Sequence, residues 1–225
     1  MHSAKRILCV GDSLGLPRNE VKFEKTWFYL VKYSFPEHEF IAQFTRGITT
    51  KSLCGDNSND YLEFYSPQIL ILQIGIVDCA PRYFKSNSII LKLVSILPGY
   101  FKRMTWALIK KFVKRTPNNA DVTSFEFKEN LTSYLLRAET MKLNRVIIIK
   151  IGNPGEAMLR QNPLIRDQVI NYNKVLNDIS LSFRFVQLID PLNEGASGLY
   201  LADGYHLSEV GHSKVFDEIS KTLEY

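Results

Sequence analysis

Near its beginning the chain reads RILCVGDSLG, residues 6–15. The first five of these residues form a short apolar run, and the Gly-Asp-Ser sequence that follows is typical of a turn, so we expect a buried β-strand over residues 6–10. Ligands of open parallel sheets bind beyond the carboxyl ends of the strands. The stretch therefore predicts a parallel sheet and places Asp12 and Ser13 at its functional edge.

Four further runs have the length and composition of strands. They are EFIAQFT (39–45), QILILQI (68–74), RVIIIKI (145–151) and FRFVQLI (183–189). Stretches with helical periodicity lie between and after the strands, at residues 27–33, 101–113, 125–141, 165–181 and 209–223. Because strand and helix alternate along the chain, we expect one three-layer α/β domain in which helices cover both faces of a parallel sheet.

The composition is that of an ordinary globular domain. The 225 residues are 45% hydrophobic and 23% charged, with 12 glycines and 9 prolines, which excludes disordered, collagen-like and low-complexity chains. The apolar runs at 6–10 and 89–97 are too short for a secretory signal or a membrane span. The three cysteines cannot all pair and have no metal-ligand spacing, so we expect a reduced, cytoplasmic protein.

Polar residues that could perform acyl transfer follow the predicted strands. Ser13 follows the first strand, and Asp203 and His206 lie beyond the last one. A hydroxyl nucleophile, an imidazole base and a carboxylate that orients the base are the groups this chemistry needs. The Asp-x-x-His spacing lets one turn bring the carboxylate to the imidazole and fix its tautomer. The backbone N–H groups of Ser13 and Gly47 are candidates for stabilising an oxyanion.

Several segments resemble a known family. ILCVGDSLG (7–15) is similar to the first sequence block of the SGNH (GDSL) hydrolase superfamily, and DGYHLSEVGH (203–212) is similar to its last block. Gly47 in FTRGITT and the segment ILQIGIVD (71–78) are placed like its second and third blocks. The resemblance implies a flavodoxin-like α/β/α sandwich with a five-stranded sheet.

The same resemblance implies an activity and assigns roles. It implies ester hydrolysis that needs no metal or other cofactor, commonly the removal of acetyl groups from carbohydrates, with a minority of acyltransferases. It implies that Ser13 is the nucleophile, His206 the base, Asp203 the partner of the base, and Gly47 an oxyanion donor.

One position departs from the family pattern. The third block normally reads G-x-N-D, with the asparagine as a third oxyanion donor, whereas this sequence has Val77 at that position. A lost oxyanion hydrogen bond reduces the rate roughly a hundred- to a thousand-fold. Either another group donates in its place, with Asn153, Arg82 and Arg46 as candidates, or the activity is weak.

Other polar residues near the predicted site have two interpretations. Asp12 and Asp78 are interpreted as carboxylates that shape their loops, while a role in substrate binding stays open for both and for Arg46 and Arg82. The run DCAPR (78–82) resembles SGNH-like proteins linked to bacterial surface polysaccharides. That similarity favours a sugar or glycan substrate.

The net charge of +5 is unevenly distributed. Residues 79–120 contain nine Lys or Arg and no Asp or Glu, so the other residues hold 19 positive and 23 negative side chains. On a helical projection two opposite sides emerge, one apolar (Phe101, Met104, Leu108, Ile109, Phe112) and one basic (Arg103, Lys110, Lys114). We therefore predict a basic helical insertion at about 82–118.

The insertion has two interpretations as well. It is either the solvated face of an ordinary packed helix, or a platform beside the site that holds an anionic glycan or touches a membrane surface through residues 99–116. The sequence shows no nucleic-acid-binding motif, so we expect no nucleic-acid partner.

Three functions are compatible with these observations. We favour a serine esterase or acyltransferase that acts on an O-acyl group, acetyl above all, of a sugar or glycan intermediate. The first alternative is a weakly active or inactive glycan-binding or assembly protein with the same fold. The second is an esterase docked on a lipid surface. The sequence leaves open the acyl group, the acceptor and the oligomeric state.

Overall fold

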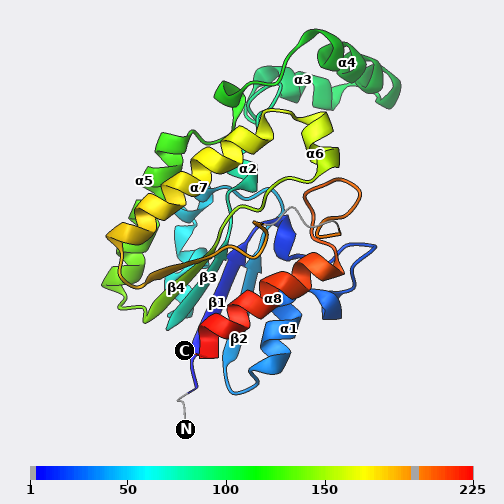
Figure 1. Ribbon diagram of the computed structural model, residues 1–225. Coiled ribbons are helices and arrows are strands. Elements are labelled where there is room, and N and C mark those ends of the chain that lie inside the picture. The colour runs from blue at the N-terminus through cyan, green and yellow to red at the C-terminus, as the bar shows by residue number, and fades with distance from the viewer. Residues whose placement is uncertain (1–3, 194–197, 225) are drawn as a thin grey trace.

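Five parallel strands form the sheet of this protein. A computed structural model describes residues 4–193 and 198–224. The strands are β1 (Arg6–Gly11), β2 (Glu39–Phe44), β3 (Ile69–Gln73), β4 (Arg145–Ile149) and β5 (Val186–Ile189). They lie in the order β2-β1-β3-β4-β5, and every neighbouring pair is parallel (Figure 1). This is the flavodoxin-like order, in which ligands bind at the carboxyl ends of β1 and β3, where the strand order reverses.

Helices cover both faces of the sheet, as the sequence predicted. The main helices are α1 (Trp27–Ser34), α5 (Ser124–Thr140), α7 (Ile165–Ser182) and α8 (Glu209–Glu224). Alternate residues of a strand face opposite sides: Leu8 and Val10 pack in one core cluster with α5 and α7, while Ile7 and Cys9 pack in the other with α1 and α8 (Figure 1). Because both faces are buried, β1 reads as a continuous apolar run.

Local capping sets where two of the helices begin. The Thr26 hydroxyl accepts a hydrogen bond from the Tyr29 N–H at the start of α1. Thr123 and Glu126 form a capping box at the start of α5. The helices predicted at 27–33, 125–141, 165–181 and 209–223 are all found within one residue of their predicted ends.

The chain contains helices that periodicity did not predict. Their bounds are α2 (Ile76–Cys79), α3 (Ile89–Ile96) and α6 (Glu156–Gln161). The two shortest span four and six residues, too few for a repeat to be recognised. Helix α3 has only Lys92 and Ser95 as polar residues. Single 3-10 turns are η1 (Ser13–Gly15), η2 (Phe23–Lys25), η3 (Thr50–Leu53), η4 (Ser58–Tyr61), η5 (Glu63–Tyr65) and η6 (Pro117–Asn119). Within the described ranges, no helix has the length and apolar character needed to span a membrane.

Helices α3 and α4 (Gly99–Phe112) form a hairpin that projects from the three layers, beyond the carboxyl ends of the strands (Figure 1). We call residues 89–112 the α3–α4 hairpin. The predicted helix at 101–113 is present and begins earlier, after Pro98, which occupies the N-cap position. Of its predicted apolar side only Ile109 is buried, whereas Phe101, Met104, Leu108 and Phe112 are exposed. The interpretation as an ordinary packed helix is therefore wrong for this segment.

Candidate active site

Ser13 lies immediately beyond the carboxyl end of β1, at the first residue of η1. Asp12 caps this turn, because its Oδ1 accepts a hydrogen bond of 2.8 Å from the Leu14 N–H. The Asp12 N–H in turn donates to the Gln73 carbonyl of the neighbouring strand β3, at 3.1 Å. The β1 carboxyl end and its turn are thus tied to the sheet, which holds the Ser13 hydroxyl in place.

The turn before α8 presents the histidine. Asp203 Oδ1 accepts hydrogen bonds from the backbone N–H groups of Tyr205 and His206, both at 3.0 Å. Gly204 stands between Asp203 and Tyr205 and has a φ of 81°, a left-handed conformation that glycine adopts without strain. The turn therefore fixes the Asp203 carboxylate and the His206 ring relative to each other.

Ser13, His206 and Asp203 form a hydrogen-bonded chain. Ser13 Oγ lies 3.1 Å from His206 Nε2, and His206 Nδ1 lies 2.6 Å from Asp203 Oδ2. An ionised carboxylate accepts, so Nδ1 carries the proton and Nε2 offers its lone pair to the serine. The geometry allows the imidazole to accept the serine proton.

The surroundings of Asp203 and His206 favour a charged carboxylate and a neutral imidazole. Partial burial acts in the opposite direction, but hydrogen bonds from the Tyr205 N–H and from His206 lower the pKa of Asp203. Burial and the positive charges of Arg18 and Arg46 outweigh the attraction of Asp203 and lower the pKa of His206. At neutral pH the carboxylate is charged and the imidazole is neutral, which is the state of a general base with its orienting partner.

A cleft of about 670 Å³ opens beside His206 and Asp203. Pro17, Arg18, Asn19, Glu20, Arg46, Leu201, Ala202, Asp203 and His206 line it. Two cations, Arg18 and Arg46, therefore face the same space as the histidine. The carboxylates of Glu20 and Asp203 line the same cleft.

Arg18 is a site residue that the sequence analysis missed. One of its guanidinium nitrogens, Nη2, contacts His206 Nε2, the same atom that faces Ser13. The loop that carries it is held by reciprocal backbone hydrogen bonds between Arg18 and Val21, at 2.9 and 3.1 Å. An arginine five residues after the candidate nucleophile was the available signal, but nothing in the sequence shows that this loop turns back over the histidine.

Two of the three candidates for the missing oxyanion donor, Asn153 and Arg82, do not line the cleft. Asn153 Nδ2 donates to the Asn193 carbonyl at 2.5 Å, and Arg82 pairs with Asp121 at 2.6 Å. Val77 lies on the short helix α2 and packs against the core. Arg46 lines the cleft, and its neighbour Gly47 has a φ of 74°. The candidates that lie on the cleft side are therefore Arg46, from the sequence, and Arg18, from the structure.

Asp12 and Asp78 are buried, and their side chains accept hydrogen bonds from loop residues. Asp78 Oδ1 accepts from the Thr50 N–H at 2.8 Å and from the Thr50 hydroxyl at 2.6 Å, which ties the loop after β3 to η3. Burial raises the pKa of Asp12 to about 7 and that of Asp78 to about 6. Neither residue lines the cleft beside His206, so both positions fit the interpretation as loop-shaping carboxylates.

In the described part of the chain, no group of three or more His, Cys, Asp or Glu side chains is arranged to hold a metal ion. The arrangement of Ser13, His206 and Asp203 supplies a nucleophile, a base and a carboxylate from the chain itself. The chemistry that this geometry can perform is acyl transfer through the serine hydroxyl.

Comparisons with solved structures agree in fold. Over 97% of this chain and 95% of the other, the protein superposes on a lipase/acylhydrolase from Enterococcus faecalis with a TM-score of 0.66 and 18% identity. It superposes on a putative lipolytic protein of the G-D-S-L family from Desulfitobacterium hafniense with a TM-score of 0.63 and 11% identity, over 96% and 98% of the two chains. The chain has the G-D-S-L hydrolase fold.

A third structure with this fold comes from an enzyme that acts on acetylated sugars. It is a catalytic mutant of Axe2, an acetylxylan esterase from Geobacillus stearothermophilus, with a TM-score of 0.65, 16% identity and coverage of 100% of this chain and 96% of that one. No protein-family model and no curated protein matches the sequence. The three-dimensional arrangement thus carries a similarity to G-D-S-L hydrolases that overall sequence identity does not.

Proposed function

We propose that the protein is a serine esterase of the SGNH type that removes or transfers an O-acyl group. The observation that supports this most is the chain of contacts from Ser13 Oγ to His206 Nε2 and from His206 Nδ1 to Asp203, in a turn at the carboxyl edge of the sheet. The same edge is where this fold places ligands.

The reaction proceeds in two balanced steps. Ser13 Oγ forms a bond to the acyl carbon while its proton passes to His206 Nε2, and the carbon–oxygen bond of the ester then breaks as His206 returns the proton to the leaving alcohol. Water or a second hydroxyl then forms a bond to the acyl carbon while its proton passes to His206 Nε2. The bond from the acyl carbon to Ser13 Oγ breaks as His206 returns that proton to Ser13 Oγ. Asp203 stabilises the imidazolium form of His206 in both steps. The backbone N–H groups of Ser13 and Gly47 donate hydrogen bonds to the oxyanion.

For the substrate we propose an O-acetylated sugar or glycan intermediate that carries an anionic group. Support for the sugar comes from the DCAPR run and from the likeness in fold to an acetylxylan esterase. Support for the anion comes from Arg18 and Arg46, which both line the cleft. Nε2 of a neutral His206 has a single lone pair, so Arg18 and Ser13 cannot both donate a hydrogen bond to this atom. An anionic group that binds Arg18 leaves Nε2 to the serine.

We also propose that residues 1–225 act as one catalytic domain that carries residues 82–118 as an insertion. Both ends of the insertion meet where the Thr116 N–H donates to the Arg82 carbonyl, at 3.1 Å. The strands on either side, β3 and β4, are neighbours in the sheet. The sheet is therefore continuous without the insertion.

A second candidate function is supported by two observations. Val77 offers no donor, and Asn153 turns its amide to Asn193, so a protein that binds a glycan without hydrolysing it would keep this fold. Labelling decides between the two. We expect a fluorophosphonate probe to label the wild type and the control Ser180→Ala, but not Ser13→Ala, and hydrolysis of a short-chain aryl acetate to follow the same pattern. An unlabelled, inactive wild type that still binds an anionic polysaccharide would establish the binding protein instead.

A further inference from the structure

The α3–α4 hairpin exposes an unusual amount of apolar surface. Nineteen large hydrophobic side chains are exposed in the described chain, and ten of them lie in these 24 residues. They are Ile89, Ile90, Leu93, Ile96, Leu97, Tyr100, Phe101, Met104, Leu108 and Phe112, and Ile96 is the most exposed at 79%. Large contiguous apolar patches on a water-soluble surface mark interaction sites.

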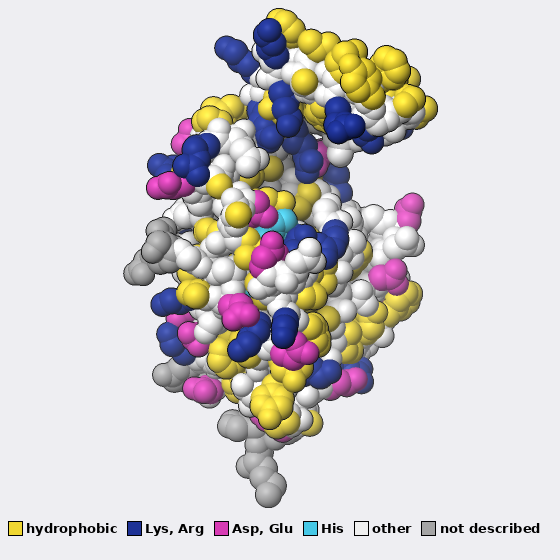
Figure 2. Space-filling model, turned by 90° about the vertical axis from the view of Figure 1, so that its right-hand side faces the viewer, with side chains coloured by type: hydrophobic (Ala, Val, Ile, Leu, Met, Phe, Trp, Pro, Cys, Tyr) yellow, Lys and Arg dark blue, Asp and Glu magenta, His cyan; other side chains and the backbone are white. Residues whose placement is uncertain are grey.

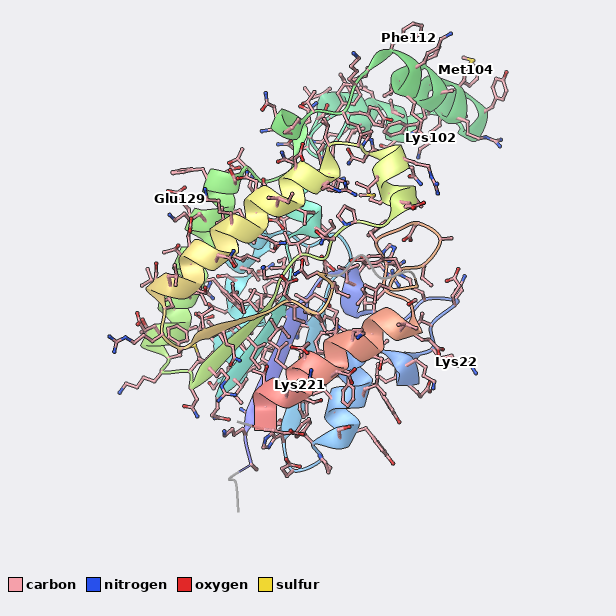
Figure 3. The ribbon with its side chains drawn as sticks, in the orientation of Figure 1. Lys22, Lys102, Met104, Phe112, Glu129 and Lys221 are labelled. Carbon is pink, nitrogen blue, oxygen red and sulfur yellow. The ribbon has the colours of Figure 1, made fainter. Side chains whose placement is uncertain are left out.

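The exposed side chains lie on one face of each helix. Phe101, Met104, Leu108 and Phe112 recur at the spacings of one helical face of α4, and only Ile109 of this helix is buried. Figure 3 shows Met104 and Phe112 pointing away from the sheet, whereas Lys102 points from the underside of α4. Figure 2 shows the same hydrophobic surface gathered at the end of the molecule. The face is convex, so it offers no groove for a protein segment.

The base of the hairpin is fixed, so this exposure is not that of a loose loop. Arg82 forms an ion pair with Asp121 at 2.6 Å, and Asn119 Nδ2 donates to the Tyr83 carbonyl at 2.7 Å. The Arg115 guanidinium lies 4.7 Å from the centre of the Tyr83 ring. These contacts hold the apolar face outward.

Cations surround this face. Residues 79–120 contain nine Lys or Arg and no carboxylate. Two of them, Arg82 and Arg115, are used at the base of the hairpin. The other seven are Lys85, Lys92, Lys102, Arg103, Lys110, Lys111 and Lys114, and no ion pair is found for any of them within residues 4–193 and 198–224. Their charge is therefore available to an external anion.

We propose that the α3–α4 hairpin docks the protein on the surface of an anionic lipid bilayer. The apolar face enters the boundary between headgroups and acyl chains, and the surrounding lysines meet lipid phosphates. A bilayer supplies an apolar phase beneath an anionic surface and adapts to a convex shape. A second copy of this chain fits less well, because a two-fold contact would bring two segments of nine positive charges together.

Docking would also orient the site. The hairpin lies beyond the carboxyl ends of the strands, and Ser13 follows the carboxyl end of β1, so the hairpin and the candidate nucleophile occupy the same end of the sheet (Figure 1). The docked protein presents this end to the lipid surface. Docking does not depend on the esterase chemistry, so the two proposals can fail separately.

Flotation with vesicles tests the proposal without measuring activity. The full chain is mixed with vesicles of phosphatidylcholine alone or of phosphatidylcholine and phosphatidylglycerol in equal parts. We expect flotation with the anionic vesicles at low salt, and weak flotation with the neutral ones. Met104→Asp/Phe112→Asp and Lys111→Glu/Lys114→Glu should each weaken binding at least roughly tenfold. The matched controls, Phe64→Asp/Leu181→Asp and Lys22→Glu/Lys174→Glu, change exposed side chains elsewhere and should float like the wild type.

Three results would overturn the proposal. One is a failure of the wild type to float with anionic vesicles. Another is equal flotation of the hairpin variants and their controls, given thermal unfolding midpoints that match the wild type. The third is a concentration-dependent dimer that Met104→Asp/Phe112→Asp abolishes while vesicles do not bind, which would assign the face to a second copy.

Discussion

Replacing Asp203 by asparagine tests the proposed chemistry at a single atom. Asp203 Oδ2 lies 2.6 Å from His206 Nδ1, and Oδ1 accepts the N–H groups of Tyr205 and His206 at 3.0 Å. An asparagine keeps Oδ1 for the two backbone donors but places an NH₂ group against Nδ1. The imidazole then accepts at Nδ1 and carries its proton on Nε2, so it cannot accept the serine proton.

The wrong tautomer reduces kcat by about 10,000-fold, or about 5 kcal/mol of transition-state stabilisation. Stability should change by about 1 kcal/mol or less, because the two backbone hydrogen bonds remain. The assay is hydrolysis of a short-chain aryl acetate, with urea unfolding of the same preparations and Asp217→Asn as the surface control. If Asp203→Asn retained activity within tenfold of the wild type while staying folded, Asp203 would not orient the base and the proposed mechanism would be wrong.

Three further predictions concern the cleft, the turn and the buried carboxylates. Arg18→Met removes a positive charge that lowers the pKa of His206, so the acid limb of the kcat/KM profile for a neutral ester should move to higher pH; an unmoved limb would place Arg18 away from the base. Gly204→Ala should destabilise the protein by roughly 2 to 4 kcal/mol in urea unfolding, because φ is 81° and a Cβ would lie 2.6 Å from the Met158 nitrogen. The control Gly99→Ala, where a Cβ meets nothing within 4 Å, should not destabilise it. The pKa of Asp78 is raised to about 6, so the stability it contributes is complete below about pH 4 and is lost as pH rises through 6. Asp78→Asn keeps the acceptor for Thr50. Between pH 4 and pH 8 its free energy of unfolding should therefore fall by about 2 to 3 kcal/mol less than that of the wild type. Equal decreases for the two proteins in urea unfolding would contradict the assignment.

Much of the fold followed from local patterns. The strands β1, β3 and β4 were readable because burial on both faces makes each a continuous apolar run. The edge strands β2 and β5 are only partly buried, but they too lie where apolar runs occur. Helix α3 was missed because it is short and only Lys92 and Ser95 form its polar side. The exposed face of α4 was misleading for the opposite reason, since its amphipathic pattern is the same whether its apolar side faces a core or the outside.

The sequence by itself determined the parallel sheet and the candidate Ser13, because a turn that follows a buried strand places its polar residues at the sheet edge. The Asp-x-x-His spacing pointed to Asp203 and His206. Tertiary structure decided which side chains share that edge. It turned the amide of Asn153 to Asn193, buried Asp78 against Thr50, and brought Arg18 to His206, 188 residues away along the chain. It also left the apolar face of the α3–α4 hairpin uncovered. These outcomes depend on contacts between distant segments, and spacing along a chain does not encode which distant segment will cover a given side chain.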